Sequence, residues 1–214
     1  MDTKEFLDSC STVGALRFPR WEELPEFDLY MDQVIALAEK YLSALSPDNK
    51  ELITPSMINN YVKSGILPAP KNKKYGRHQL ALLIMICSTK SVLEISTISD
   101  IINESLKSND MQKVFNNFAQ MYEKSLFTAS QRAVEMALRE EQENIFGDIA
   151  MENALNAGAS RTLAMYAYTA IDKKEKDEPS KEDKKSEKKS KKTKKQPAAA
   201  EKGHSDTSDV QENQ

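Results

Sequence analysis

The sequence predicts a mainly helical protein that carries one small β-hairpin and ends in a disordered tail. Apolar residues recur every three or four positions through most of residues 31–171, which is typical of amphipathic helices. Prolines, glycines and lysines interrupt this pattern within residues 53–80, so a turn or hairpin is expected there. Residues 172–214 contain no aromatic residue and one large aliphatic residue, too few to form a core. With 214 residues, the chain is long enough to bury a substantial hydrophobic core elsewhere.

The first predicted helix lies within residues 30–45. Its apolar stripe consists of Met31, Val34, Ile35, Ala38, Tyr41, Leu42 and Leu45. The residues before it combine prolines with aromatic residues and show no sustained period. We expect this lead-in to pack Trp21 and Phe27 onto the body, although it also fits a short interaction arm.

A short helix is predicted over residues 54–65, because the sequence has capping residues suited to both of its ends. Thr54 is a suitable N-cap, Pro55 suits the first helical position, and Gly65 suits the left-handed position that closes a helix. One face is apolar and comprises Met57, Ile58, Tyr61 and Val62. The other face comprises Ser56, Asn59, Asn60, Lys63 and Ser64, so packing alone does not explain it.

The segment after Gly65, "ILPAPKNKKYG", cannot be helical at its two prolines and is predicted to form an extended hairpin. In this prediction Ile66 and Leu67 lead in, the chain turns near Asn72, and Tyr75 lies on the returning strand. The following residues, 78–93, are so continuously apolar that they predict a central buried helix.

Helices are also predicted in the rest of the body. Residues 94–106 place Ile95, Ile98, Ile101 and Ile102 on one face, and residues 110–127, 129–146 and 148–171 show further helical stripes. No heptad pattern is sustained over three or four repeats, which argues against a long coiled coil.

The charge is distributed in blocks. Residues 51–90 carry a net charge of +5 between two regions, residues 1–50 and 91–171, that each carry −5. A cationic island within an acidic body favours a polyanionic partner at that island. The tail has thirteen lysines against eleven acidic residues, which suits either a solubilising segment or a polyanion-binding arm.

The sequence favours a cytoplasmic protein without a membrane anchor. The two cysteines, Cys10 and Cys87, form neither a disulfide framework nor a CxxC pair. The N-terminus lacks the basic and apolar regions of a secretion signal. The apolar run at residues 80–87 has eight residues, against about 20 needed to cross a bilayer.

No motif in the sequence indicates catalysis, a metal or a cofactor. His78 and His204 lack partners at metal-ligand spacing, and no glycine-rich phosphate loop or nucleophile elbow is present. Acidic pairs such as Glu140 and Glu141 suit a solvated helix surface. We therefore expect a protein that is not an enzyme.

The stretch "MINNYVKSGILPAPKNKKYGRHQLALLIMI", together with "PRWEELPEFDLYMDQVI" before it, resembles an uncharacterised bacterial domain-of-unknown-function family whose core is similar to MerR-type regulators. The resemblance covers about residues 17–105. It implies a MerR-like winged helix-turn-helix with a small β-hairpin wing. Together with the periodicity and composition of the rest of the chain, the expected fold is mainly α, this winged helix-turn-helix plus C-terminal helices and a disordered tail. In such proteins a recognition helix ends in a glycine-containing turn, a β-hairpin wing follows, and a tyrosine precedes the next helix.

Carried over by position, the resemblance implies that residues 54–65 are the recognition helix and residues 69–77 the basic wing. Asn59 stands where the family type has a phosphate-contacting arginine, Tyr61 is retained, and Lys73 corresponds to the basic residue of the wing. The wing is shorter than usual, the loop at residues 46–53 is longer, and Gly76 replaces the usual Ser or Thr cap.

The residues themselves also favour DNA binding, because Asn can bond adenine in the major groove and Lys or Arg can contact phosphate. The predicted DNA-binding residues are Ser56, Asn59, Asn60, Lys63, Lys71, Lys73, Lys74, Tyr75 and Arg77. The amides and lysines also fit an ordinary solvated surface, and Tyr61 and Tyr75 also fit packing roles.

The sequence thus predicts four regions: an N-terminal lead-in (1–29), a MerR-like winged-helix DNA-binding domain (30–107), a C-terminal helical region (108–171) and a Lys-rich tail (172–214). The expected function is transcription regulation by a DNA-binding homodimer, with double-stranded DNA as partner. The sequence leaves open whether a small-molecule effector exists. The alternative is a non-catalytic protein-interaction module on the same scaffold. Nonspecific binding by the tail alone is a third possibility.

Overall fold

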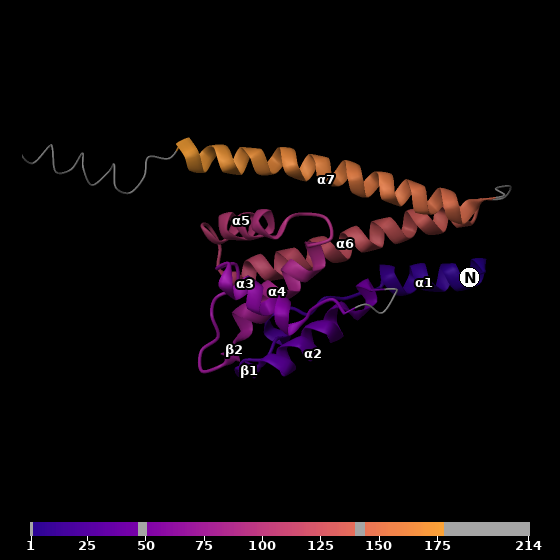
Figure 1. The fold of residues 1–214 in the computed structure, drawn as a ribbon. Helices are drawn as coiled ribbons and strands as arrows, with labels where there is room; N and C mark the ends of the chain where they lie inside the picture. Colours follow the sequence, from indigo (N-terminus) through magenta and orange to yellow (C-terminus); the bar gives the residue numbers. More distant parts are fainter. Residues whose placement is uncertain (1, 47–50, 140–143, 178–214) are drawn as a thin grey trace, which may run out of the picture. The chain divides into compact units, whose positions relative to one another are not determined.

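The computed structural model describes residues 2–46, 51–139 and 144–177, and this part of the chain is mainly helical (Figure 1). In chain order the elements are α1 (Thr3–Gly14), the 3-10 turn η1 (Trp21–Glu23), β1 (Leu29–Tyr30), α2 (Met31–Leu42), the 3-10 turn η2 (Ser43–Leu45), α3 (Pro55–Lys63), β2 (Lys74–Tyr75), α4 (Arg77–Thr89), α5 (Ile95–Leu106), α6 (Met111–Ala137) and α7 (Ile145–Asp177). The predicted predominance of helix is confirmed.

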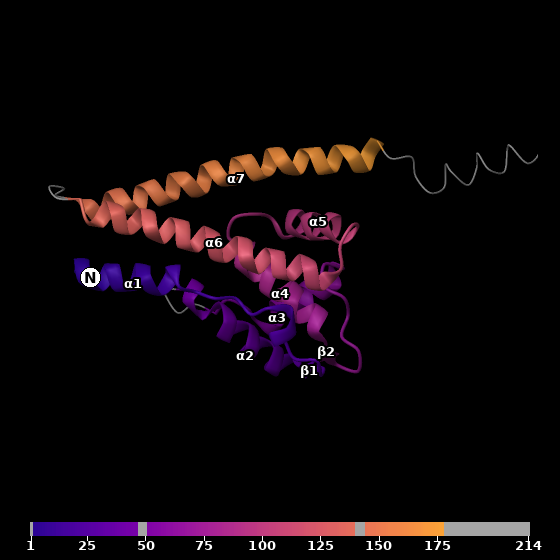
Figure 2. The same cartoon turned by 180° about the vertical axis from the view of Figure 1, so that it is seen from behind.

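The core surrounds α4, as the continuous apolar run predicts. Most of its side chains are buried, including Leu83 and Ile84, which are 0% exposed. Residues from the N-terminal lead-in, such as Phe18, and from α6, such as Phe115, belong to the same hydrophobic cluster. The core therefore includes residues on both sides of positions 30 and 107. Figure 2 shows α2, α3, α4 and the strands gathered near one end of α6.

The predicted lead-in contains a helix that sequence reasoning missed. In α1, the Asp2 side chain accepts a hydrogen bond from the Glu5 amide at 2.8 Å, and the Glu5 carboxylate accepts one from the Asp2 amide at 3.0 Å. This reciprocal capping box starts the helix. Figures 1 and 2 show α1 alongside the far half of α6, where Ser130 Oγ donates to the Cys10 carbonyl at 2.5 Å.

The prediction for the aromatic residues of the lead-in is half right. Trp21 is 9% exposed and belongs to the core, whereas Phe27 is 69% exposed. Phe27 lies in a bend two residues before β1, outside the strand in which Leu29 is buried. The chain direction changes at this bend, so the inward position of Leu29 does not extend to Phe27.

The small sheet is built differently from the predicted hairpin. β2 pairs antiparallel with β1 from the lead-in, with Leu29 opposite Tyr75 and Tyr30 opposite Lys74. The strand partner was predicted at Ile66 and Leu67, and that part of the prediction is wrong. Leu67 is instead buried, 1% exposed, because its side chain fills the core after α3.

The predicted break between helices at residue 128 is also wrong, since α6 runs without interruption from Met111 to Ala137. Its second half is held by α1, through buried side chains that include Ser130 and Ala133. Packing of this kind outweighs the modest helix propensity of serine and threonine. The isoleucine face predicted for residues 94–106 is confirmed in α5, where Ile98 and Ile102 are buried.

Some sequence-based expectations fall outside the described residues. They concern part of the 46–53 connection, the pair Glu140 and Glu141, and the tail beyond residue 177 with His204. Among the described helices, none has an apolar stretch long enough to span a membrane.

Candidate nucleic-acid interface

Helix α3 is defined at both ends by the capping residues that the sequence predicts. Thr54 Oγ1 accepts a hydrogen bond from the Met57 amide at 3.2 Å, and Pro55 takes the first helical position. At the other end Gly65 has a φ of 74°. The Ile66 amide donates to the Tyr61 carbonyl at 3.0 Å, and the Gly65 amide donates to the Val62 carbonyl at 3.1 Å. These bonds form a Schellman motif, which fixes the length of the helix.

The two faces of α3 are sharply different. Ile58 and Tyr61 are 0% and 5% exposed and anchor the helix in the core. The outer face is exposed, and we call its side chains the polar face of α3. They are Ser56, Asn59, Asn60 and Lys63. All four were predicted from the sequence as binding residues, and the structure brings them together on one exposed surface.

A tight two-residue turn, which we call the lysine turn, lies between Lys71 and Lys74. These two residues exchange backbone hydrogen bonds, each 2.9 Å from nitrogen to oxygen. Between them Asn72 and Lys73 both have positive φ, 51° and 63°. That geometry is the type I′ turn, whose twist matches an antiparallel pair of strands. The predicted turn at Asn72 is therefore present, and it projects Lys71 and Lys73 into solvent.

Two residues of the predicted wing, Lys74 and Tyr75, are less available than the lysine turn. Lys74 is partly buried, and its Nζ lies 4.9 Å from the centre of the Tyr30 ring. Tyr75 is 2% exposed, and burial raises the pKa of its hydroxyl. Tyr75 therefore packs in the core, the alternative that the sequence left open, and it does not reach a partner at the surface.

Arg77 is held by groups of the lead-in. Its guanidinium lies 3.2 Å from the Glu26 carboxylate, donates to the Pro25 carbonyl at 3.3 Å, and sits 5.4 Å from the Trp21 ring. Its side chain is 17% exposed. The Glu26 carboxylate offsets its charge, so Arg77 adds little positive potential to the surface.

The polar face of α3 and the lysine turn are joined by a short connector, residues 64–70, which α4 holds in place. Gln79 Nε2 donates to the carbonyls of Pro68 and Ala69 at 3.5 and 3.3 Å, while its Oε1 accepts from the Gly76 amide at 2.7 Å. Gln79 thus fixes both ends of the segment that carries the turn. Sequence reasoning missed this residue, whose only signal was its place three positions after a glycine N-cap.

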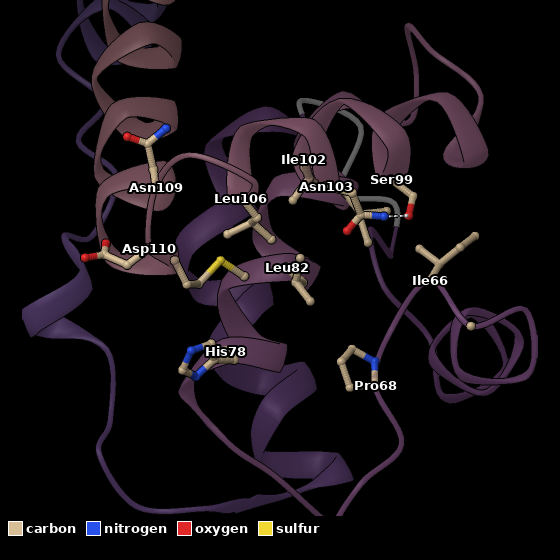
Figure 3. A pocket seen from close by; sticks show the side chains of 13 residues that line it. Ile66, Pro68, His78, Leu82, Ser99, Ile102, Asn103, Leu106, Asn109 and Asp110 are labelled. Atoms are coloured by element: carbon tan, nitrogen blue, oxygen red, sulfur yellow. Dashed lines mark hydrogen bonds between the residues drawn. The ribbon is translucent and has the colours of Figure 1, made fainter. Parts of the chain in front are cut away.

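A pocket of about 390 Å³ lies between this connector and the helices α4, α5 and α6 (Figure 3). Its apolar walls include Ile66, Leu82 and Ile102. Its polar groups are His78, Ser99, Asn103, Asn109 and Asp110. The size suits a small molecule. An occupant would touch the connector that directly follows α3.

The polar side chains of the pocket already contact one another, nearby backbone groups or an aromatic ring. Asn103 Nδ2 donates to Ser99 Oγ at 3.4 Å, and Asn109 Nδ2 donates to the Ser105 carbonyl at 3.1 Å. Asp110 Oδ1 accepts from the Lys113 amide at 2.8 Å and caps α6. His78 packs edge-on against Trp21, with ring centres 5.0 Å apart. These contacts explain the conformation of the residues without a ligand.

Nucleophiles and metal ligands are not grouped in the part of the chain that the structure describes. No set of three His, Cys, Asp or Glu side chains there is arranged to hold a metal ion. Cys10 and Cys87 are both buried and free, and burial raises the pKa of Cys87 to about 11. That thiol stays protonated at neutral pH and serves as a packing group.

The fold and the surface define a mainly helical domain that presents a short polar helix and a cationic turn. The chain belongs to the DUF1836 family, a domain of unknown function, which matches residues 19–125. The match begins after α1 and ends within α6, so it includes both the polar face of α3 and the lysine turn. Neither the curated proteins nor the solved structures contain a significant match.

Proposed function

We propose that this protein is a non-catalytic regulator of transcription that binds double-stranded DNA as a homodimer, in the manner of MerR-like winged helix-turn-helix proteins. The observation that carries the proposal is the polar face of α3. It is exposed, fixed at both helix ends, and anchored by buried Ile58 and Tyr61. A rigid helix of this kind fits the width of the major groove.

The chemistry of the polar face suits base reading. The side chains of Asn59 and Asn60 are both exposed, and a side-chain amide can bond the N6 and N7 atoms of adenine together. Lys63 lies near the C-terminal end of α3, where it can contact guanine or phosphate. None of these polar groups is needed for the core, which the opposite face supplies.

The lysine turn supplies the second half of the proposed interface. Lys71 and Lys73 are exposed on a turn whose two backbone hydrogen bonds restrict its motion. Phosphate contacts of this kind position a protein on DNA without reading its sequence. Because α2 packs against both α3 and β2, the helix and the turn keep a fixed relation. The partly buried Lys74 contributes from the base of the turn.

One short helix reads only a few base pairs, so the proposal includes pairing of two chains on two half-sites. The competing function is a protein-interaction module without affinity for DNA. The exposed aromatic side chains of Phe27 and Tyr30, 69% and 52% exposed beside the sheet, are the observation that favours it. Binding to duplex DNA distinguishes the two functions.

The proposal is tested by selecting duplex oligonucleotides from a random pool with the full-length protein. We expect the wild-type protein to enrich a motif, and the double variant Asn59→Ala and Asn60→Ala to lose the preference for adenine at specific positions. Each lost bidentate contact should reduce discrimination by about 1–3 kcal/mol. Bulk affinity should fall less, because the lysines still contact phosphate.

A matched control is offered by α6, where Asn117 and Gln120 are also exposed side-chain amides. The double variant Asn117→Ala and Gln120→Ala should enrich the same motif as the wild type. Equal loss of preference in both double variants would remove α3 from the account. Absence of any DNA binding by the wild type would favour the interaction module.

A further inference from the structure

Helix α7 carries a row of large apolar side chains that nothing in the described chain covers. Met151, Leu155, Leu163 and Tyr166 are 62%, 66%, 70% and 72% exposed. Ala159 stands between them and is also exposed. Their spacing of three and four residues places all five on one face of the helix, which we call the outer stripe of α7.

The contacts of α7 with the rest of the molecule are made by a different face. Ile149 is buried with Cys10 and Met136. Further along, Tyr168 Oη donates to the Asp100 carboxylate at 2.7 Å. These residues are offset from the outer stripe around the helix, so the helix can be held by the body while the stripe stays free.

The composition of α7 is unusual for a helix with so much exposed surface. Residues 145–171 contain only three charged residues, Asp148, Glu152 and Arg161. Glu152 faces Arg132 of α6 at 3.9 Å, and Arg161 Nε donates to the Val92 carbonyl at 2.9 Å. Arg161 is thus directed toward the body, whereas Asp148 and Glu152 lie on the side of the helix that carries the outer stripe, near its N-terminal end. A long and largely apolar surface of this kind marks an interaction site.

We propose that the outer stripe of α7 is the dimer interface, and that it packs antiparallel against the same stripe of a second copy. The order of side chains along the stripe is nearly the same in both directions from Ala159. In an antiparallel pair with its two-fold axis at Ala159, Leu155 faces Leu163 of the other copy. Met151 then meets the turn that carries Tyr166. A two-fold interface requires this self-complementarity.

The residues at the centre of the stripe allow two helices to approach closely. Ala159 at the centre has only a methyl side chain and is exposed. Packed helices lie about 8–10 Å apart, with Cα atoms about 2.3 Å from each axis. The Cα atoms of two facing Ala159 residues would therefore lie about 3.4–5.4 Å apart.

The available area is sufficient for a specific interface. Each of the four large side chains exposes on the order of 100 Å² of apolar surface. With the alanines between them, two copies bury about 1,000 Å² in total, the size at which specific interfaces begin. A second copy is the favoured occupant because it supplies the same spacing of residues in reverse.

This inference deepens the proposed function. It rests on that function for the role of the dimer, which is to present two α3 helices to two DNA half-sites. Its test uses no nucleic acid, so it fails or succeeds independently of DNA binding. Loss of DNA binding with an intact dimer would point to α3 and the lysine turn. A monomer that still binds DNA would overturn only the α7 interface.

The alignment of the two α7 helices about Ala159 is tested by cross-linking the full-length variant Ala159→Cys under mild oxidation. Because Cα atoms within about 7 Å can be joined by a disulfide, we expect most of the chains to form a covalent dimer on a non-reducing gel. The native Cys10 and Cys87 are buried, so the wild type should not cross-link. Ala150→Cys is the matched control, since Ala150 is exposed on another face of α7. Little cross-linking of Ala159→Cys, or equal cross-linking of both variants, would overturn the register.

The interface itself is tested by light scattering on the double variant Leu155→Glu and Leu163→Glu at micromolar concentration. The wild type should have the mass of a dimer and the variant that of a monomer, because four carboxylates would meet across the axis. Leu138→Glu is the matched control, since Leu138 is 62% exposed and lies outside α7. A monomeric wild type, or a dimeric double variant, would overturn the proposal. If the double variant does not fold, the cross-linking pattern decides.

Discussion

At the scale of single residues, the best-defined polar contact joins the N-terminal lead-in to α6. Arg20 donates from both terminal nitrogens to the Glu123 carboxylate, at 2.9 and 2.7 Å, and the Phe18 amide donates to it at 2.8 Å. Burial by itself raises the pKa of Glu123. The hydrogen bonds from Arg20 and Phe18 outweigh burial and leave the pKa below its usual value.

The pKa of Glu123 gives a prediction about acid stability. Because the folded state lowers this pKa, the carboxylate contributes stability above its unfolded pKa, about 4.3, and the contribution is lost as the pH falls through the folded value. Glu123→Gln should reduce the free energy of unfolding by about 1–2 kcal/mol at pH 7. The difference between wild type and variant should shrink below about pH 4.

Urea unfolding measured from pH 7 down to pH 3 checks this expectation. Glu135→Gln is the control, because Glu135 is an exposed glutamate on the same helix. A constant difference between wild type and Glu123→Gln across this range would show that the ion pair does not contribute through its charge.

What the sequence predicts at this scale is local. Thr54, Pro55 and Gly65 act within a few residues of their own positions, so their roles can be read from residue type and spacing. Arg20 and Glu123 are far apart in the chain, and no periodicity links them. The inward turn of Arg77 toward Glu26 could not be predicted for the same reason.

At the scale of secondary-structure elements, α3 depends on the left-handed residue that ends it. Gly65 has a φ of 74°, and a Cβ added there would meet nothing within 4 Å, so substitution is penalised by backbone conformation alone. Gly65→Ala should lower the free energy of unfolding by about 1 kcal/mol. It should also loosen the connector that carries the lysine turn.

Gly158 offers the opposite case. It lies inside α7, and a Cβ added there also meets nothing within 4 Å, so Gly158→Ala should raise the free energy of unfolding by about 0.5–1 kcal/mol. Thermal unfolding of both variants at one protein concentration checks the pair. Destabilisation of equal size would contradict the assignment of Gly65 to a left-handed cap.

The elements that could be predicted are those with a clear local pattern, such as the periodic apolar stripes of α2 and α5 and the continuous apolar run of α4. The errors arose where an element depends on a distant partner. β1 has two residues and exists because β2 pairs with it. α6 continues past residue 128 because α1 covers its second half. The polar face of α3 could be predicted in full because it follows from helical spacing alone.

At the scale of the whole molecule, two exposed surfaces of the described chain carry the proposals. One combines the polar face of α3 with the lysine turn, and the other is the outer stripe of α7. The first is cationic and the second is apolar, so they suit different partners. We propose duplex DNA as the partner of the first and a second copy of the chain as the partner of the second.

The salt dependence of DNA binding tests the central claim most directly. The proposed interface offers up to four phosphate contacts per protomer, from Lys63, Lys71, Lys73 and Lys74. Each contact makes the slope of log affinity against log salt concentration more negative by about 0.9. The wild-type slope should therefore reach about −3 to −4 per protomer. Lys71→Glu with Lys73→Glu should reduce its magnitude by about 2 per protomer.

The control Lys113→Glu with Lys124→Glu changes the net charge equally at two exposed lysines of α6, and it should lower affinity only slightly and leave the slope nearly unchanged. A steep wild-type slope that flattens only in the Lys71 and Lys73 variant is the result we predict. The same slope in all three proteins, or no binding by the wild type at low salt, would contradict the assignment of this surface to DNA.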